Sequence, residues 1–151
     1  YGGDFEGTAK RWCENFKRLD ANTQKRVTVE NDDKGSMWST KHLFDYIHSD
    51  IGIPIVFDYH HYKFCTGGQT EQEALELAMS TWPDGVTPVV HYSQSRAEEH
   101  NDPKIRPQAH SDSYWAAPNL YGHDLYVMCE CKHKEQGVFA LLELMKNKAV
   151  A

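Results

Sequence analysis

The chain has 151 residues, which is enough to bury a hydrophobic core and predicts one domain. Hydrophobic residues make up 40% and charged residues 25%, values typical of a globular protein and not of a disordered chain. Sixteen Lys and Arg against twenty-two Asp and Glu give a formal charge of −6, which argues against a module that binds nucleic acid by positive charge alone. A nucleic-acid enzyme is still compatible with this charge, because bound divalent cations neutralise a carboxylate-rich site.

Targeting and redox features are sparse. No apolar run approaches the ~20 residues of a membrane helix, so we expect no membrane association, and residues 1–4 do not resemble a signal peptide. The cysteines are Cys13, Cys65, Cys129 and Cys131. They form no Cys-x-x-Cys pair, so we predict reduced, packed thiols, with the cytoplasm as the default location.

The first half of the chain alternates helical and extended patterns. Apolar residues spaced by three and four predict an amphipathic helix over residues 4–19, and a β-branched run at 26–30 predicts a short strand. Ser39 is the expected N-cap of a second helix. A nearly continuous apolar run at 53–58 predicts the next strand.

The second half repeats this alternation. Thr70 and Glu73 form a predicted capping box for a third helix, which precedes a strand at 87–91. A long polar segment at 93–124 contains three prolines and is expected to be either a functional loop or a disordered one. The last predicted elements are a strand at 125–130 and a helix from about 136 to 145. Apolar strands that alternate with amphipathic helices predict an α/β protein with a parallel sheet.

Each predicted strand ends in a residue that can bind a metal ion. These residues are Glu30, Asp58, His91 and Glu130. Parallel strands end at one edge of the sheet, where barrels and open α/β sheets place their sites, so the four side chains should converge. His61 and His110 lie just downstream of two of these positions. Three carboxylates and three imidazoles suit Mn²⁺, Zn²⁺ or Fe²⁺.

A plainer interpretation applies to each residue alone. A single acid at a strand end most often caps the next helix, but several such acids in register repel one another unless a cation lies between them. Of His60 and His61, at least one is expected only to pack or to form hydrogen bonds. Lys132 and Lys134 are either solvated charges or phosphate-binding groups beside Glu130. The histidines predicted to have surface roles are His42, His48, His100, His123 and His133.

Five stretches, in this order and spacing, resemble the ultraviolet-damage DNA endonuclease family. They are VENDDK at 29–34, IPIVFDYHH at 53–61, HYS at 91–93, AHSD at 109–112 and MCECKHKE at 128–135. The resemblance implies a TIM-type (β/α)₈ barrel, of which residues 1–151 would form one partial domain, the C-terminal half. That half would contain about four parallel strands with flanking helices.

The same resemblance implies a chemistry. Such enzymes nick damaged double-stranded DNA on the 5′ side of ultraviolet photolesions by metal-assisted phosphodiester hydrolysis. The implied ions are divalent, usually Mn²⁺, with Zn²⁺ or Mg²⁺ as alternatives. Glu30 and Lys132 would have catalytic roles, and Lys132 would steady the phosphate. The implied metal ligands are Glu30, Asp58, His61, His91, His110 and Glu130.

The sequence departs from the family pattern in two ways. Val89 occupies the position of a family lysine that takes part in the metal cluster, so we expect at least one metal position to be weakened or missing. The earlier strands of the barrel, with three further histidine ligands, are not in this chain. Half a barrel would leave two strand edges unpaired, so we expect either two copies to associate or an N-terminal half-barrel to complete it.

Two other functions are compatible with these residues. A metal-dependent sugar isomerase or epimerase uses a similar strand-end pattern, although the stretches at 30–33 and 130–135 favour the nuclease. A half-domain that binds metal without turnover is the second alternative, because residues of one site act as a unit.

Overall fold

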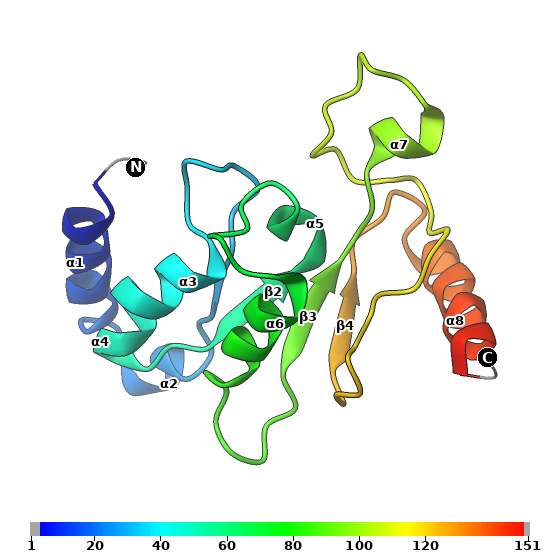
Figure 1. Cartoon of the computed structure of the whole chain (residues 1–151). Coiled ribbons are helices and arrows are strands. Elements are labelled where there is room, and N and C mark those ends of the chain that lie inside the picture. The colour runs from blue at the N-terminus through cyan, green and yellow to red at the C-terminus, as the bar shows by residue number, and fades with distance from the viewer. Residues whose placement is uncertain (1–3, 150–151) are drawn as a thin grey trace.

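The computed structural model describes residues 4–149 (Figure 1). The strands are β1 (Val29–Glu30), β2 (Ile55–Asp58), β3 (Val89–Tyr92) and β4 (Tyr126–Cys129). The helices are α1 (Phe5–Phe16), α2 (Ala21–Gln24), α3 (Thr40–Leu43), the π-helical turn η1 (Phe44–His48), α4 (Ser49–Ile51), α5 (Tyr59–Tyr62), α6 (Glu71–Met79), α7 (Arg96–His100) and α8 (Glu135–Ala149).

The strands form one parallel sheet in the order β1-β2-β3-β4, which confirms the predicted α/β class. Glu30 pairs with Val56, Asp58 pairs with His91, and His91 pairs with Met128. The strands are shorter than the apolar runs that predicted them, and β1 contains only Val29 and Glu30. Because all strands point the same way, their carboxyl ends lie along one edge, at the top of Figure 1.

Side-chain caps set where several helices begin. The Ser39 and Thr70 hydroxyls accept hydrogen bonds from the backbone N–H groups of His42 and Glu73, so both predicted N-caps are confirmed. The first helix is shorter than predicted. It ends at Phe16, and the side chain of Asp20 then caps the separate helix α2.

One face of the sheet packs against helices. Ile55, Phe57 and Val90 are buried in a core that also contains Ile47 of η1 and Leu75 of α6. These strand residues alternate with side chains that point to the other face, as in any β-strand. Because helices cover one face of the sheet, the polar residues at the strand ends lie on the opposite face.

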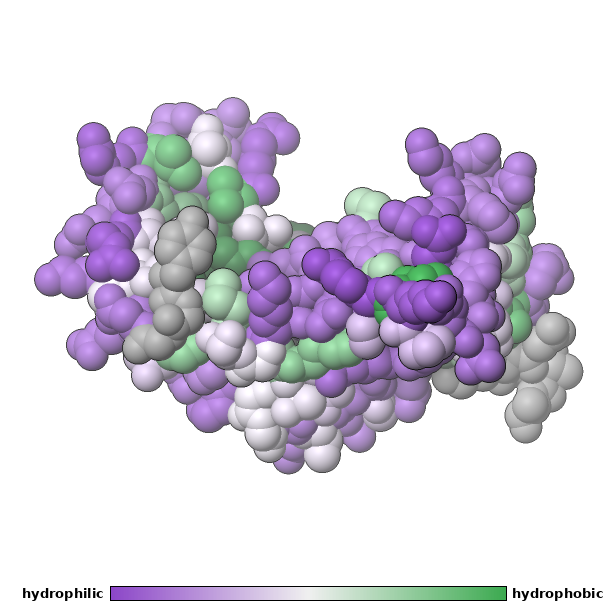
Figure 2. Space-filling view, turned by 90° about the horizontal axis from the view of Figure 1, so that it is seen from above, coloured by the Kyte–Doolittle hydropathy of each residue, from purple (hydrophilic) through white to green (hydrophobic). Residues whose placement is uncertain are grey.

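The opposite face is concave and partly open. Seen from the carboxyl ends of the strands, the molecule is hollowed between its two ends (Figure 2). Register places Val89 beside Tyr126, and His91 beside Met128, on this face. Tyr126 is 65% exposed and Met128 is 52% exposed, although both lie on a strand of the sheet. A concave sheet face with polar residues at the carboxyl ends of its strands is typical of the inner face of a barrel.

The long segment after β3 is ordered against the sheet. It contains α7, and an antiparallel bridge between Ser95 and His110 closes its loop. The Tyr92 and Tyr59 hydroxyls donate hydrogen bonds to backbone carbonyls of the segment, at Ala116 and Asn119. This anchoring fixes His110 at the carboxyl edge.

The other sequence predictions concern cysteines and membranes. All four cysteines are free, and Cys13 and Cys65 are buried, as predicted. Within residues 4–149, no helix combines the length and apolarity needed to cross a lipid bilayer.

Candidate metal centre

Three potential ligands meet at the carboxyl edge of the sheet. One ligand atom each from Glu30, Asp58 and His91 lie within 4.8 Å of one another. They come from β1, β2 and β3, and the parallel register that pairs Asp58 with His91 brings the second and third together. The predicted convergence of these strand-end side chains is therefore observed.

The carboxylate of Asp58 has two functions, one for each oxygen. Oδ1 accepts hydrogen bonds from the backbone N–H groups of His60 at 2.7 Å and His61 at 2.8 Å, so it caps α5. Oδ2 is buried and has no hydrogen-bond partner among the described residues. A carboxylate oxygen buried without a donor is costly, and a bound cation would satisfy it.

Asn31 holds the backbone at Asp58 in place. Its side-chain Oδ1 accepts from the Asp58 N–H at 2.8 Å, and its Nδ2 donates to the Asp58 carbonyl at 3.0 Å. Asn31 is only 1% exposed, so this pair of bonds is shielded from water. Asn31 was not among the predicted site residues, because its partner Asp58 lies 27 residues away in the chain.

Glu30 lies between two imidazoles. Its Oε1 is 3.1 Å from His61 Nδ1, and its Oε2 is 3.2 Å from His91 Nδ1. His61 Nδ1 also lies 2.8 Å from the Asn31 carbonyl oxygen, which fixes the orientation of the ring. Both carboxylate oxygens of Glu30 are therefore held by residues of the same cluster.

Glu130 and His110 extend the cluster beyond β3. Glu130 Oε1 is 3.4 Å from His91 Nδ1, and Glu130 Oε2 is 3.8 Å from His110 Nδ1. These contacts connect all six residues that were predicted as ligands. They are Glu30, Asp58, His61, His91, His110 and Glu130.

The pKa shifts in this cluster have opposite directions for the two acids. Burial raises the pKa of Asp58 to about 6, although the neighbouring His61 opposes the shift. Burial also acts to raise the pKa of Glu30, but hydrogen bonds from His61 and His91 outweigh it and lower this pKa to about 2. The same contacts raise the pKa of His61, against its burial, to about 9. The imidazoles of His61 and His91 thus stabilise the ionised form of Glu30 in the metal-free protein.

The remaining predicted site residue is at the rim. Lys132 is exposed. Its backbone N–H donates to the carbonyl of Ser111 at 2.9 Å, and Ser111 directly follows His110 in the chain. Val89 lies two residues before His91 on the same strand face, so an apolar side chain lines the sheet there. That position therefore contributes no ligand.

His60 is packed and His100 is exposed, as predicted, and the structure adds their partners. His60 is fully buried and packs edge-on against His110, with ring centroids 5.8 Å apart, so it is the packed member of the His60–His61 pair. His100, predicted to have a surface role, joins Glu99 and Asp112 in a second group of potential ligands. This second group was missed because its members lie on a loop and not at strand ends.

Comparison with known proteins identifies the family. A family model described as UV-endonuclease UvdE matches residues 1–151. The chain belongs to this family. A UV DNA damage endonuclease of Bacillus cereus (strain G9842) is 32% identical over 148 residues, which cover 93% of this chain and 44% of that protein. A UV-damage endonuclease of Neurospora crassa is 30% identical over 157 residues, which cover 95% of this chain and 23% of that protein.

The UvdE fold is also matched by a solved structure. The crystal structure of SacUVDE superposes with a TM-score of 0.78 at 28% identity, over 96% of this chain and 48% of that one. This match confirms the predicted fold, four parallel strands of a TIM-type barrel with flanking helices. The chain spans about half the length, or less, of the relatives that it matches.

Proposed function

We propose that this chain contributes the metal-binding half of a DNA repair endonuclease that nicks DNA at ultraviolet lesions. The family supports a role in DNA repair. The observation that carries the proposal is the carboxylate of Asp58, which offers a ligand atom within 4.8 Å of those of Glu30 and His91 and whose buried Oδ2 has no hydrogen-bond partner. Such an atom needs a cation to offset its burial.

The donor set fits a divalent ion. Glu30, Asp58 and His91 would form the core of the site, while His61, His110 and Glu130 would complete it. Mixed carboxylate and imidazole donors suit Mn²⁺, which we take as the physiological ion over Zn²⁺ and Mg²⁺. When bound, such an ion acts as a Lewis acid toward phosphate and lowers the pKa of a coordinated water.

The protein residues would orient this chemistry. Asn31 and the first turn of α5 fix Asp58, and the two imidazoles fix Glu30, so the ligands need little rearrangement. An open cavity of about 320 Å³, lined by Glu30, Asn31, Asp32, Asp33 and His61, adjoins the cluster. Its acidic lining would repel a phosphodiester until cations neutralise it, so metal binding would precede DNA binding.

Lys132 would contact the DNA backbone. It is exposed beside Ser111, on the His110 side of the cluster, where its ammonium group could reach a phosphate. Damaged DNA would be selected by its deformability, because a lesion lowers the cost of unstacking. The cytoplasmic location stays a prediction.

The test is a nicking assay on irradiated supercoiled plasmid with Mn²⁺, beside unirradiated plasmid. We expect nicking of the irradiated plasmid and its loss in Asp58→Asn, which removes the ligand charge but keeps the side-chain shape. Asp112→Asn is the matched control and should retain activity. The proposal would be contradicted if the chain bound metal stoichiometrically but did not nick DNA, even after addition of the part of a relative that this chain does not match. That result would support the non-catalytic alternative. Turnover of a sugar would support the isomerase alternative.

A further inference from the structure

A buried histidine beside the metal centre has no part in the chemistry proposed above. His60 lies on the first turn of α5, is 0% exposed, and has no hydrogen-bond partner on either ring nitrogen within residues 4–149. Burial lowers the pKa of its imidazole to about 4, so the neutral ring offers one donor and one acceptor. Two unpaired polar atoms inside a protein are costly, and an apolar side chain would pack here without that cost. Packing alone therefore does not account for a histidine at this position.

The His60 ring packs against Phe64 and His110. Both pairs are nearly perpendicular, with ring centroids 5.2 Å apart for Phe64 and 5.8 Å apart for His110. The ring of His61 also lies close to His110, with centroids 6.2 Å apart. His110 therefore packs against two successive residues of α5, of which His61 is a predicted ligand and His60 is not.

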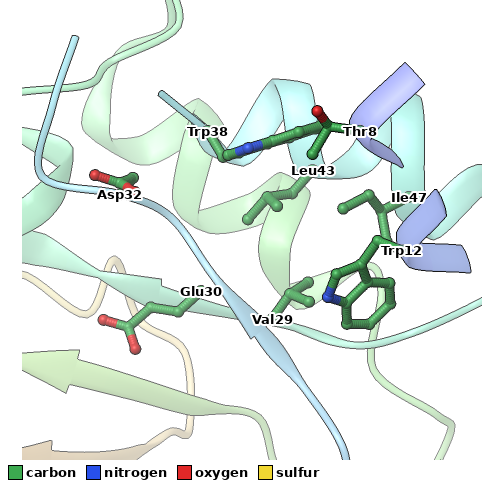
Figure 3. A pocket seen from close by; sticks show the side chains of 8 residues that line it. All are labelled: Thr8, Trp12, Val29, Glu30, Asp32, Trp38, Leu43 and Ile47. Atoms are coloured by element: carbon green, nitrogen blue, oxygen red, sulfur yellow. The ribbon is translucent and has the colours of Figure 1, made fainter. Parts of the chain in front are cut away.

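The ligands on β1 and α5 have partners that fix their side chains. Figure 3 shows the carboxylate of Glu30 pointing away from Trp12, and His61 Nδ1 lies 3.1 Å from its Oε1. The same nitrogen of His61 lies 2.8 Å from the carbonyl oxygen of Asn31. A histidine that binds a metal ion with one nitrogen is usually oriented by a hydrogen bond on the other.

His110 lacks a partner of this kind. Its backbone is fixed, because an antiparallel bridge joins it to Ser95. Its imidazole forms no hydrogen bond with any residue of 4–149, and its Nδ1 is 3.8 Å from Glu130 Oε2. His60 is the neighbour that packs against this ring and still has unpaired polar atoms.

We propose that His60 is a positioning residue that orients His110 for metal binding. In the metal-bound protein, one nitrogen of His60 accepts the N–H of His110, and its other nitrogen donates to the backbone carbonyl of Gln108. The backbone of Gln108 is close to the ring, because it opposes the effect of burial on the pKa of His60. These two bonds satisfy both nitrogens of His60 and leave the second nitrogen of His110 for the ion. The inference rests on the proposed metal centre.

The experiment is a double-mutant cycle on Mn²⁺ affinity, measured by isothermal titration of the metal-free chain. His60→Phe keeps a ring without polar atoms and should weaken Mn²⁺ binding by about 10–100-fold. His60→Gln keeps a donor and an acceptor and should restore the affinity to within about threefold of the parent chain. When His110→Ala is already present, adding His60→Phe should change the affinity less than about twofold, because the residue that His60 orients is gone.

His48→Phe is the matched control. His48 also packs on a phenylalanine, Phe44, and its Nδ1 lies 2.8 Å from a backbone carbonyl oxygen, that of Ile53. Ile53 precedes β2, at the end of the sheet opposite the metal centre. His48→Phe should therefore change the Mn²⁺ affinity less than about twofold. Circular dichroism checks that each variant is folded, and His60→Leu replaces His60→Phe if that variant is not.

The outcomes separate this inference from the proposed function. If the parent chain bound no Mn²⁺, the proposed function would fail and this inference with it. If the parent chain bound Mn²⁺ and His60→Phe bound it equally well, this inference alone would be overturned. An equal loss in His48→Phe, no recovery in His60→Gln, or a full further loss when His60→Phe is added to His110→Ala would also overturn it.

Discussion

Two clusters in this protein contain the same kinds of side chain in different settings. The strand-end cluster has Glu30, Asp58 and His91, and the loop cluster has Glu99, His100 and Asp112. In the loop cluster, His100 Nε2 lies 2.6 Å from Asp112 Oδ2, and Glu99 accepts from the backbone N–H of Ser113 at 3.0 Å. In the strand-end cluster, Asp58 Oδ2 is buried without a hydrogen-bond partner, and His61 Nε2 lies 4.0 Å from it.

The pKa values of the two aspartates, Asp58 and Asp112, are shifted in opposite directions. A hydrogen bond from His100 lowers the pKa of Asp112, whereas burial raises the pKa of Asp58 to about 6. Asp112 already has a hydrogen-bond partner in His100, and Arg96 Nε lies 3.2 Å from its Oδ1. Residue type alone therefore does not identify a metal site. A buried oxygen without a hydrogen-bond partner distinguishes the strand-end cluster as the one that a bound ion would stabilise.

The largest expected effect is that of Asp58→Asn on Mn²⁺ binding by the strand-end cluster. Loss of the buried ligand charge should weaken Mn²⁺ binding by more than about 100-fold, because a ligand contributes more than an outer-shell partner. Isothermal titration of the metal-free protein with Mn²⁺ measures this change. Asp112→Asn, in the loop cluster, should change the affinity less than about threefold. Equal losses in both variants would remove the distinction between the clusters.

Asn31→Ala tests the support of the buried ligand. The substitution leaves the backbone N–H and carbonyl of Asp58 unpaired, which should cost about 2–4 kcal/mol of unfolding free energy. It should also weaken Mn²⁺ binding by about 10–100-fold. Urea unfolding and metal titration measure the two effects. Ser95→Ala, which removes the cap of α7 beside the loop cluster, should cost only about 1 kcal/mol. A smaller cost for Asn31→Ala than for Ser95→Ala would refute this account.

The unfolding free energy of the metal-free protein should fall as the pH rises from 6.5 toward 9. The pKa of His61 is raised from 6.5 to about 9, so its ion pairs are fully present below pH 6.5 and are lost as the imidazole deprotonates. We expect a loss of about 1–3 kcal/mol across this range. Urea unfolding at several pH values measures it. His61→Gln should flatten the profile, and an unchanged slope in this variant would exclude His61 as the cause.

Lys132→Ala should have the smallest effect. Removing one phosphate contact should reduce the slope of log affinity against log salt by about 1 and weaken DNA binding about equally for all sequences. Fluorescence anisotropy with a photodimer-containing duplex and Mn²⁺, repeated at several salt concentrations, measures this slope. Lys25→Ala at the end of α2 is the control. If Lys25→Ala reduced this slope as much as Lys132→Ala, Lys132 would make no specific contact with the DNA backbone.

The sequence predicted the features that depend on local pattern and topology. The apolar runs indicated four parallel strands, and strand polarity placed Glu30, Asp58 and His91 together. Ser39 and Thr70 were found as N-caps because capping depends on residues three positions apart.

Features that depend on distant neighbours were not predicted. Asn31 acts on Asp58 from a position 27 residues away in the chain, and no local pattern reveals this contact. The approach of Glu99 and Asp112 depends on the closure of the loop by Ser95 and His110.

The most direct test of the strand-end metal centre is anomalous diffraction at the manganese absorption edge from a crystal soaked in Mn²⁺. We predict an anomalous peak between Glu30, Asp58 and His91, and none between Glu99, His100 and Asp112. A peak at the loop cluster alone, or no peak at the strand ends, would contradict the claim that the buried carboxylate of Asp58 marks the metal centre.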